Sequence, residues 1–241
     1  MENQFSRTEL LIGKENEEKL HSSKVAIFGI GGVGSFVVEA LARAGIENFI
    51  LVDNDVVDIT NINRQIIATH STIGKAKVEI AKERILDINP NTKVQAVQMF
   101  FCKDSEEILD TSIDYVIDCI DTVSSKIELI VKAKSLQISI ISCMGTGNKL
   151  DPGKFEITDI YKTNICPLAK VMRKELKKRE IKDLKVLYSK EEPIKIKKSN
   201  NEYEMLENLT LKKQVPGSIS FVPSVAGLII AGEVVKDLIN I

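Results

Sequence analysis

The sequence contains no closely spaced pair of cysteines. Its four cysteines, Cys102, Cys119, Cys143 and Cys166, lie far apart in a chain of 241 residues and form no Cys-x-x-Cys motif. A structural zinc site needs four ligands gathered in space, so zinc of this kind is excluded. Widely spaced cysteines are typical of reduced thiols in the cytoplasm. Cys119 and Cys143 fall in apolar strands and are expected in the core, whereas Cys166, before a proline in an expected loop, is either a reactive thiol or a loop residue without a role.

The chain also lacks a long uninterrupted apolar run. The longest, residues 222–235, is broken by Gly227, Gly232 and Glu233 and is shorter than the roughly 20 residues that a membrane helix needs. Residues 1–8 are polar without the apolar core of a signal peptide, so neither export nor a membrane span is expected. The composition, 44% hydrophobic and 28% charged with a net charge of −1, fits one α/β core in a cytoplasmic protein.

What the sequence does contain is a glycine-rich turn between an apolar strand and a helix. The strand, residues 25–28, leads into the motif Gly29-x-Gly31-Gly32-x-Gly34. In such a motif the first glycine permits the tight turn, the second lets a ligand approach the backbone, and the last lets the helix that begins near Ser35 pack closely on the strand. The N–H groups at the start of that helix then face an anion. The pattern predicts a phosphate-binding loop, and a strand–helix turn with spare glycines is the alternative.

A second apolar strand, residues 49–52, ends in Asp53. An acidic residue at about that distance past the glycines usually binds a ribose hydroxyl. Strand, turn, helix, strand and acid in this order predict a nucleotide-binding α/β fold, a Rossmann-like and mostly parallel sheet with flanking helices.

Charged residues beyond Asp53 favour a nucleoside triphosphate over a nicotinamide cofactor. Breaking a phosphoanhydride requires cations on the developing charge, and Arg64 and Lys77 are candidates for that role. Asp121 follows a strand that ends near Asp118, where an oxygen ligand would hold magnesium. Taken singly, Arg64 and Lys77 are equally compatible with surface charges, and Asp118 or Asp121 with the cap of the next helix.

These motifs together resemble the adenylation domain of the ubiquitin-activating-like superfamily, the ThiF, MoeB and HesA group. The resemblance runs from Arg7 to about residue 147, and its motifs are Gly-x-Gly-Gly-x-Gly, Asp53-x-Asp55, Asn61-x-x-Arg64-Gln65, Gly74-Lys75-Ala76-Lys77 and Asp118-x-x-Asp121. Members of the group that activate carrier proteins of thiamine and molybdopterin synthesis usually carry the two Cys-x-x-Cys pairs that this chain lacks.

The resemblance implies a role for each matching residue. ATP would lie on the glycine loop, with Asp53 on the ribose and Asp55 as a further nucleotide-binding acid. The other implied contacts are Arg64 and Lys77 on the phosphates, Asp121 on Mg²⁺, and Asn61 as a polar contact near the phosphates, for which a plain turn residue is the alternative. Arg7 would reach the phosphates of a neighbouring subunit, which implies a homodimer.

Beyond Gly147 the chain becomes basic. We expect a turn and a strand within residues 149–163, a charged helix over about 167–179, a strand at 186–189 and a lysine-rich loop. Residues 170–213 hold 14 lysines and arginines against 8 aspartates and glutamates, a net charge of +6 in a chain whose total is −1. Concentrated positive charge attracts a polyanion, although a solvated helix face is the alternative. The candidate residues for contact with such a polyanion are Lys170, Arg173, Lys174, Lys177 and Lys178.

Two motifs in this half of the chain extend the resemblance to nearly its whole length. Residues 158–173, Thr-Asp-Ile-x-Lys-Thr-x-x-Cys-Pro-Leu-Ala-Lys-x-x-Arg, and residues 216–227 are similar to the tRNA threonylcarbamoyladenosine dehydratase branch. That branch implies activation of the threonyl carboxylate by ATP, followed by attack of the neighbouring carbamoyl group and ring closure with net loss of water. No thiol is required, and some members cooperate with a cysteine desulfurase system.

Three functions therefore stay open at this point: the tRNA dehydratase, an adenylyltransferase for the C-terminal glycine of a ubiquitin-like sulfur carrier, and a nicotinamide-dependent oxidoreductase. The missing zinc ligands and the basic segment favour the first over the second, and Arg64, Lys77 and Asp121 disfavour the third. The predicted organisation is a single adenylation-type domain. It consists of an ATP-binding core at 24–147, a tRNA-binding extension at 148–222 and a packing helix at 223–241.

Overall fold

A single seven-stranded sheet forms the centre of the molecule. The computed structural model describes residues 3–195 and 216–241, apart from the side chains of Asp104 and Glu106. The strands run in the spatial order β3-β2-β1-β4-β5-β7-β6, and all neighbours pair in parallel except β6 and β7. Their bounds are β1 Lys24–Phe28, β2 Asn48–Val52, β3 Lys93–Val97, β4 Tyr115–Asp118, β5 Ser139–Cys143, β6 Phe155–Asp159 and β7 Lys185–Ser189. The predicted mostly parallel α/β fold is confirmed.

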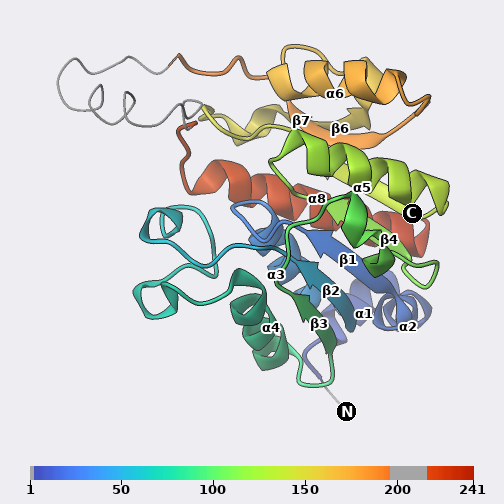
Figure 1. Ribbon diagram of the computed structural model, residues 1–241. Coiled ribbons are helices and arrows are strands. Elements are labelled where there is room, and N and C mark those ends of the chain that lie inside the picture. The colour runs from blue at the N-terminus through green and yellow to red at the C-terminus, as the bar shows by residue number, and fades with distance from the viewer. Residues whose placement is uncertain (1–2, 196–215) are drawn as a thin grey trace.

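Helices cover both faces of this sheet (Figure 1). Because side chains alternate along a strand, Val25 and Ile27 of β1 join the core under α3, α4 and α8, while Ala26 and Phe28 join the core under α5 and α6. The helices are α1 Ser6–Ile12, α2 Lys14–Ser22, α3 Gly34–Ala44, α4 Lys77–Ile88, α5 Val123–Ser135, α6 Pro167–Lys177 and α8 Phe221–Ile239. Short 3-10 helices are η1 Ile59–Asn61, η2 His70–Thr72, η3 Lys103–Ile108, η4 Pro152–Lys154 and η5 Ile160–Lys162.

The basic half of the chain continues the same sheet. β7 pairs with β5 of the nucleotide-binding half, and β6 then pairs with β7 as an antiparallel edge strand. The predicted helix and strand of this half correspond to α6 and β7, and the C-terminal helix begins at Phe221, two residues before the predicted start. Most of the predicted lysine-rich loop lies outside the described residues. Within those residues, no helix combines the length and the apolar character that a membrane crossing requires.

The expected position of Cys119 is wrong, and one of the two alternatives left open for Cys166, the reactive thiol, is excluded. Cys119 lies one residue beyond β4 and lines a pocket, rather than sitting inside the strand. Cys166 is the N-cap of α6 and only 2% exposed, because the loop before this helix folds onto the α5 and α6 side of the core. A buried thiol of this kind is inaccessible, so Cys166 is not the reactive cysteine that its place before a proline suggested.

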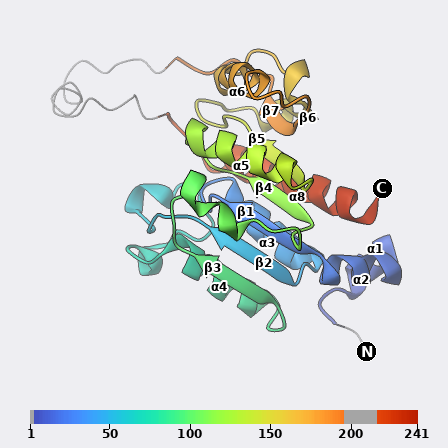
Figure 2. The same cartoon turned by 45° about the vertical axis from the view of Figure 1, so that its right-hand side comes forward.

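The topology fixes where a ligand can bind. From β1 the sheet extends toward β2 on one side and toward β4 on the other, so the connections leave in opposite directions at this point. A crevice opens at the carboxyl ends of the strands where such a reversal occurs. The N-terminal helices α1 and α2 lie at the other end of the strands (Figures 1 and 2).

Candidate nucleotide-binding site

A cavity of about 450 Å³ occupies this crevice. The loops that follow five strands of the sheet supply most of its walls, at residues 28–33, 52–55, 99–101, 119–122 and 143–147, and residues 216–218 contribute from the far end of the chain. Its size falls within the range of pockets that bind small molecules and cofactors. The sequence predicted the first, second and fourth of these loops as parts of the site, but not the third and fifth.

The glycine loop is shaped by contacts that larger residues would break. Gly29 has φ +88°, and a Cβ there would lie 2.7 Å from the carbonyl oxygen of Cys119. A Cβ on Gly34 would lie 1.8 Å from the carbonyl oxygen of Gly29, so only glycine allows α3 to start against this turn. A Cβ on Gly31, in contrast, would meet only Gln65 Nε2, at 4.0 Å. The space beside Gly31 is therefore available to a ligand.

Asp53 ties the glycine loop to the end of β2. Its Oδ2 accepts a hydrogen bond from the Ile30 N–H at 2.6 Å, and its Oδ1 accepts one from the Asp55 N–H at 2.8 Å. Burial raises the pKa of Asp53, partly offset by the positive charge of Lys77. The carboxylate lines the pocket as a hydrogen-bond acceptor, which is what a ribose hydroxyl requires.

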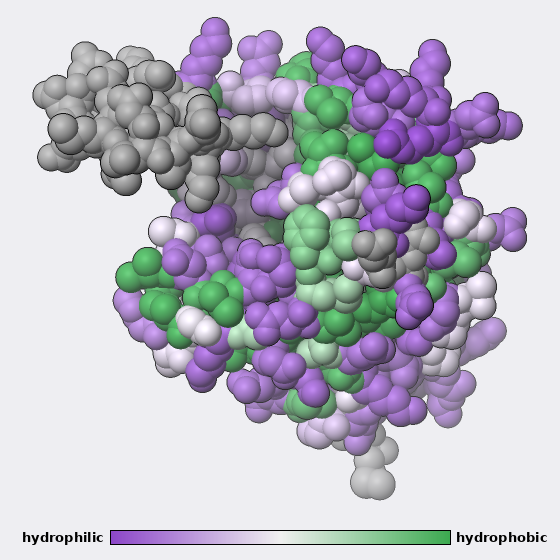
Figure 3. All heavy atoms as spheres, viewed as in Figure 1, coloured by the Kyte–Doolittle hydropathy of each residue, from purple (hydrophilic) through white to green (hydrophobic). Residues whose placement is uncertain are grey.

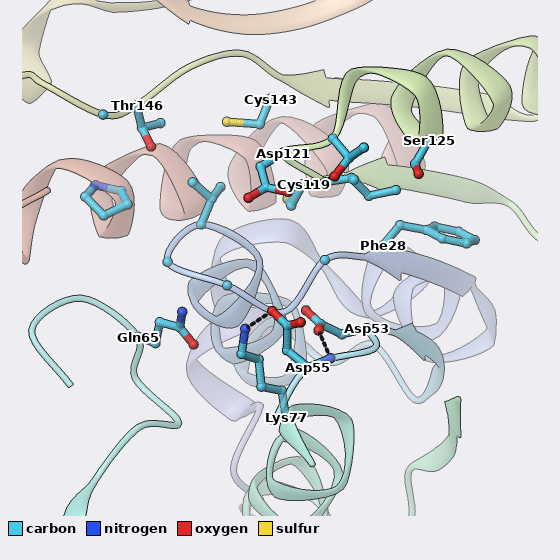
Figure 4. Close-up of a pocket in the computed structure, with 18 of the residues that line it drawn as sticks. Phe28, Asp53, Asp55, Gln65, Lys77, Cys119, Asp121, Ser125, Cys143 and Thr146 are labelled. Carbon is cyan, nitrogen blue, oxygen red and sulfur yellow. Dashed lines mark hydrogen bonds and ion pairs between the residues drawn. The ribbon is translucent and has the colours of Figure 1, made fainter. Parts of the chain in front are cut away.

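Lys77 is a buried cation in the pocket wall and not a surface charge. It is the first residue of α4 and only 5% exposed. Its Nζ lies 2.7 Å from Oδ2 of Asp55, whose side chain is 55% exposed (Figure 4). Asp55 therefore orients Lys77 toward the cavity, and the two form a pair that the motif Asp53-x-Asp55 alone did not predict.

The segment of residues 61–65 lines the pocket beside the glycine loop. Asn61 is 8% exposed, and its side-chain oxygen accepts a hydrogen bond from the Asp58 N–H at 3.1 Å. It therefore also has the structural role in a turn that was the alternative to a contact near the phosphates. Arg64 is half-buried and donates to the Thr60 carbonyl at 2.8 Å and to Asn63 Oδ1 at 2.9 Å. Both predicted residues reach the pocket.

Gln65 is a pocket residue to which the sequence analysis assigned no role. It is 6% exposed, and its Oε1 has no hydrogen-bond partner among the described residues. An unpartnered buried acceptor that lines a pocket is a candidate ligand contact. The sequence feature that could have predicted a role for Gln65 is its position directly after Arg64 in the motif Asn61-x-x-Arg64-Gln65.

Asp121 projects from a turn that a buried ion pair holds in place. Lys126 of α5 is 0% exposed, with its Nζ 2.9 Å from Asp118 Oδ2 and 2.9 Å from the Ile120 carbonyl oxygen. Asp118 also accepts hydrogen bonds from the Ile120 N–H at 3.1 Å and from the Ser142 hydroxyl at 2.5 Å. The first acid of the motif is thus structural, while the exposed Asp121 faces the pocket.

The two cysteines of the pocket wall are unsuited to nucleophilic chemistry. Burial raises the pKa of the Cys143 thiol to about 12 and holds that of Cys119 well above its usual value. Only a thiolate is a good nucleophile, so both groups are protonated and inert near neutral pH.

The comparisons with known proteins agree with this geometry. The model of the ThiF family matches residues 5–241. This chain belongs to the ThiF family. The tRNA threonylcarbamoyladenosine dehydratase of Bacillus subtilis is 48% identical over 244 residues, which cover 100% of this chain and 96% of that protein. The predicted resemblance to this branch is confirmed.

Two solved structures of E. coli tRNA N6-threonylcarbamoyladenosine dehydratase, TcdA, share the fold over 98% of this chain and 94% of theirs. The complex with ATP aligns with a TM-score of 0.86 at 31% identity, and the complex with AMP with a TM-score of 0.87 at 30% identity.

In this ThiF-family chain, Asn148 forms hydrogen bonds that hold Ile194, of the basic segment at residues 170–213, and Gly217 together at the mouth of the pocket. Asn148 has φ +58°, its N–H donates to the Gly217 carbonyl at 2.8 Å, and its Oδ1 accepts from the Gly217 N–H at 2.7 Å. Its carbonyl also accepts from the Ile194 N–H at 2.8 Å. One residue beside Gly147 therefore joins two positions that are 23 residues apart in the sequence, a contact that no local pattern predicts.

Helix α6 presents a row of exposed lysines. Lys170, Lys174 and Lys177 are spaced i, i+4 and i+7 and lie on one face of the helix, where hydrophilic side chains cover the surface (Figure 3). The other two predicted tRNA contacts are engaged within the protein. Arg173 donates to the Thr163 carbonyl at 3.0 Å, and Lys178 pairs with Glu175 at 2.7 Å.

Arg7 lies far from the pocket of its own chain. It is exposed on α1, two residues after Phe5, whose ring packs against His21 with ring centroids 5.2 Å apart. Nδ1 of His21 in turn lies 2.7 Å from the carbonyl oxygen of Gly45, at the end of α3 remote from the glycine loop. Within one chain, the structure therefore does not bring Arg7 together with the other predicted nucleotide contacts.

Proposed function

We propose that this chain is an ATP-dependent dehydratase that cyclises threonylcarbamoyladenosine in tRNA. The observation that carries the proposal is the similarity of this chain, over its whole length, to the tRNA threonylcarbamoyladenosine dehydratase of Bacillus subtilis. The pocket supports it, because Lys77 and Asp121 line the same cavity as the glycine loop. We place the enzyme in the cytoplasm, where its tRNA substrate would be found, and a cysteine desulfurase system stays a predicted partner.

The proposed chemistry needs two steps, the first at the α-phosphorus of ATP and the second at the threonyl carbonyl carbon. An oxygen of the threonyl carboxylate attacks phosphorus and pyrophosphate leaves, and the resulting acyl adenylate is then attacked by the carbamoyl group, which closes the ring and releases AMP. Arg64 and Lys77 offset the charge that develops on the phosphates. The second step is fast because the nucleophile is already tethered beside the activated carbonyl.

Magnesium fits this site through Asp121. Mg²⁺ commonly takes one or two carboxylates and fills its other positions with water and ligand phosphates. Within residues 3–195 and 216–241 no set of three His, Cys, Asp or Glu side chains gathers as a metal site, so phosphates would have to complete the coordination. Asp121 would hold the ion, which would neutralise phosphate charge when bound.

A direct test is to incubate the purified protein with ATP, Mg²⁺ and tRNA that carries threonylcarbamoyladenosine. The expected product is a nucleoside lighter by one water, with release of AMP and pyrophosphate, measured by nucleoside mass spectrometry. If the nucleoside mass stays unchanged while a ubiquitin-like carrier protein becomes adenylated at its C-terminal glycine, the carrier-activating function predicted as the alternative is correct.

The row of lysines on α6 is proposed to bind tRNA phosphates. Reversing the charge of Lys170, Lys174 and Lys177 to glutamate should weaken tRNA binding and leave ATP binding unchanged, because these exposed side chains lie outside the pocket. Each lost phosphate contact should also lower the slope of log affinity against log salt by roughly 0.7 to 0.9. Fluorescence anisotropy at several salt concentrations measures both effects.

The matched control reverses Lys14, Lys19 and Lys93, which are exposed on α2 and β3 and change the net charge equally. Equal weakening by both triple variants would assign tRNA binding to net charge and not to α6.

The active unit is proposed to be a homodimer in which Arg7 completes the partner's pocket. The support is the exposed position of Arg7 at the opposite end of the strands from its own pocket, next to Leu10 and Leu11, which are 88% and 85% exposed. Apolar side chains as exposed as these are typical of surfaces covered by another chain. An Arg7→Ala protein mixed with a Lys77→Ala protein should regain activity, because each mixed dimer holds one intact site. Mixed dimers that stay inactive, verified by two affinity tags, would refute this arrangement.

A further inference from the structure

The hydroxyl of Ser125 is buried and unpaired in a residue of the pocket wall. Ser125 lies in the first turn of α5, is 3% exposed and lines the pocket. Its Oγ has no hydrogen-bond partner among the described residues. Burial of a hydroxyl without a partner is unfavourable, so a native structure that keeps one needs a reason for it.

The position of Ser125 in the pocket indicates which part of a nucleotide it meets. In Figure 4, Asp53 lies between Ser125 and Lys77, the residue expected to contact the phosphates. Figure 4 shows Ser125 and Phe28 at one side of the pocket and Gln65 at the other. A nucleotide with its phosphates on the glycine loop and its ribose on Asp53 therefore directs its base toward Ser125.

The walls at this end suit a flat aromatic base. The rings of Phe28 and Phe101 meet edge to face with centroids 5.0 Å apart, and Met99 and Phe100 also line the pocket. These side chains offer apolar surface but no strong hydrogen-bonding group.

The nearby backbone is already engaged, since the Ile120 N–H donates to Asp118 and the Ile120 carbonyl accepts from Lys126. The Ser125 hydroxyl, in contrast, keeps its full capacity both to donate and to accept a hydrogen bond.

We propose that the Ser125 hydroxyl hydrogen-bonds a nitrogen on the edge of the purine base and thereby contributes to nucleotide selection. The proposal rests on the proposed use of ATP in this pocket. It differs from a structural role for Ser125, because a structural hydroxyl would be paired within the protein.

The test compares Ser125→Ala with Ser124→Ala, a control at the neighbouring exposed position of the same helix turn. Calorimetry with MgATP should give a dissociation constant that is roughly three- to tenfold higher for Ser125→Ala than for the wild type, and unchanged for Ser124→Ala. The ligand-free Ser125→Ala protein should melt at the wild-type temperature or above it, since it loses only an unpaired hydroxyl. A lower melting temperature with unchanged ATP affinity would make Ser125 structural and overturn the proposal.

Base analogues locate the contact. The triphosphates of purine riboside, 1-deazaadenosine, 3-deazaadenosine and 7-deazaadenosine lack the 6-amino group, N1, N3 and N7, respectively. One of them should bind the wild type more weakly than ATP does, yet bind wild type and Ser125→Ala equally well. If all four analogues lose the same factor in both proteins, the hydroxyl does not contact the base.

The proposed function and the proposed role of Ser125 can fail separately. A wild-type protein that binds no ATP would refute the proposed function together with this inference. A wild type that binds ATP and dehydrates the tRNA nucleoside, but whose ATP affinity is indifferent to Ser125→Ala, would refute only the inference.

Discussion

Lys77→Ala is expected to lower the rate of adenylate formation by about 10²–10³-fold, the typical loss when one preorganised donor to a developing negative charge is removed. Lys77 is buried in the pocket wall and held by Asp55 at 2.7 Å, so little reorganisation is needed when charge develops on the phosphates. The measurement is single-turnover release of pyrophosphate with saturating ATP and substrate tRNA. Folding should be little affected, because the Asp55 carboxylate left behind is 55% exposed to water.

The matched control is Lys75→Ala, an exposed lysine two residues earlier, in the loop that leads into α4. It should retain wild-type turnover. A Lys77→Ala protein that turns over at the wild-type rate would remove Lys77 from the reaction and leave it as a structural partner of Asp55.

Lys126→Met is expected to destabilise the fold by about 3–5 kcal/mol, because it leaves the carboxylate of Asp118 buried without its cation. Both side chains are 0% exposed, so water cannot replace the lost partner. For a domain of this size the loss corresponds to a melting temperature lower by roughly 6–20 °C, which calorimetry or thermal circular dichroism detects. The Mg²⁺ concentration needed for half-maximal activity should also rise, since Lys126 bonds the carbonyl of Ile120, next to Asp121.

Two controls separate the ion pair from general effects of mutation. Adding Asp118→Asn to Lys126→Met should restore part of the lost stability, because the amide keeps a hydrogen-bonding group beside Ser142 without an uncompensated charge. Lys134→Met removes an ion pair with Asp183 at the surface of the same helix and should cost at most about 1 kcal/mol. Equal losses for Lys126→Met and Lys134→Met would contradict a special role for the buried pair.

The sequence by itself determined the features that depend on local spacing. The glycine motif, the acid after β2 and the short apolar runs predicted the nucleotide-binding fold, because turns, strands and helix starts are set by residues within a few positions of each other. Asp121 was a candidate because it follows a strand whose end was visible in the sequence, whereas Arg64 and Lys77 were candidates because the breaking of a phosphoanhydride requires cations. The prediction of α6 and β7 likewise rested on their local patterns of apolar and charged residues.

Only the tertiary structure decided which of these groups are buried and what they contact. Lys77 and Lys126 are both lysines at helical positions, yet both are buried against carboxylates from other segments. Cys166 precedes a proline, as many loop residues do, but it is buried in the core. Asn148 forms hydrogen bonds with both Ile194 and Gly217, which are distant from it in the sequence. Burial and long-range pairing result from how the sheet and its helices pack, so residues distant in sequence, and not local spacing, determine the chemical role of each of these side chains.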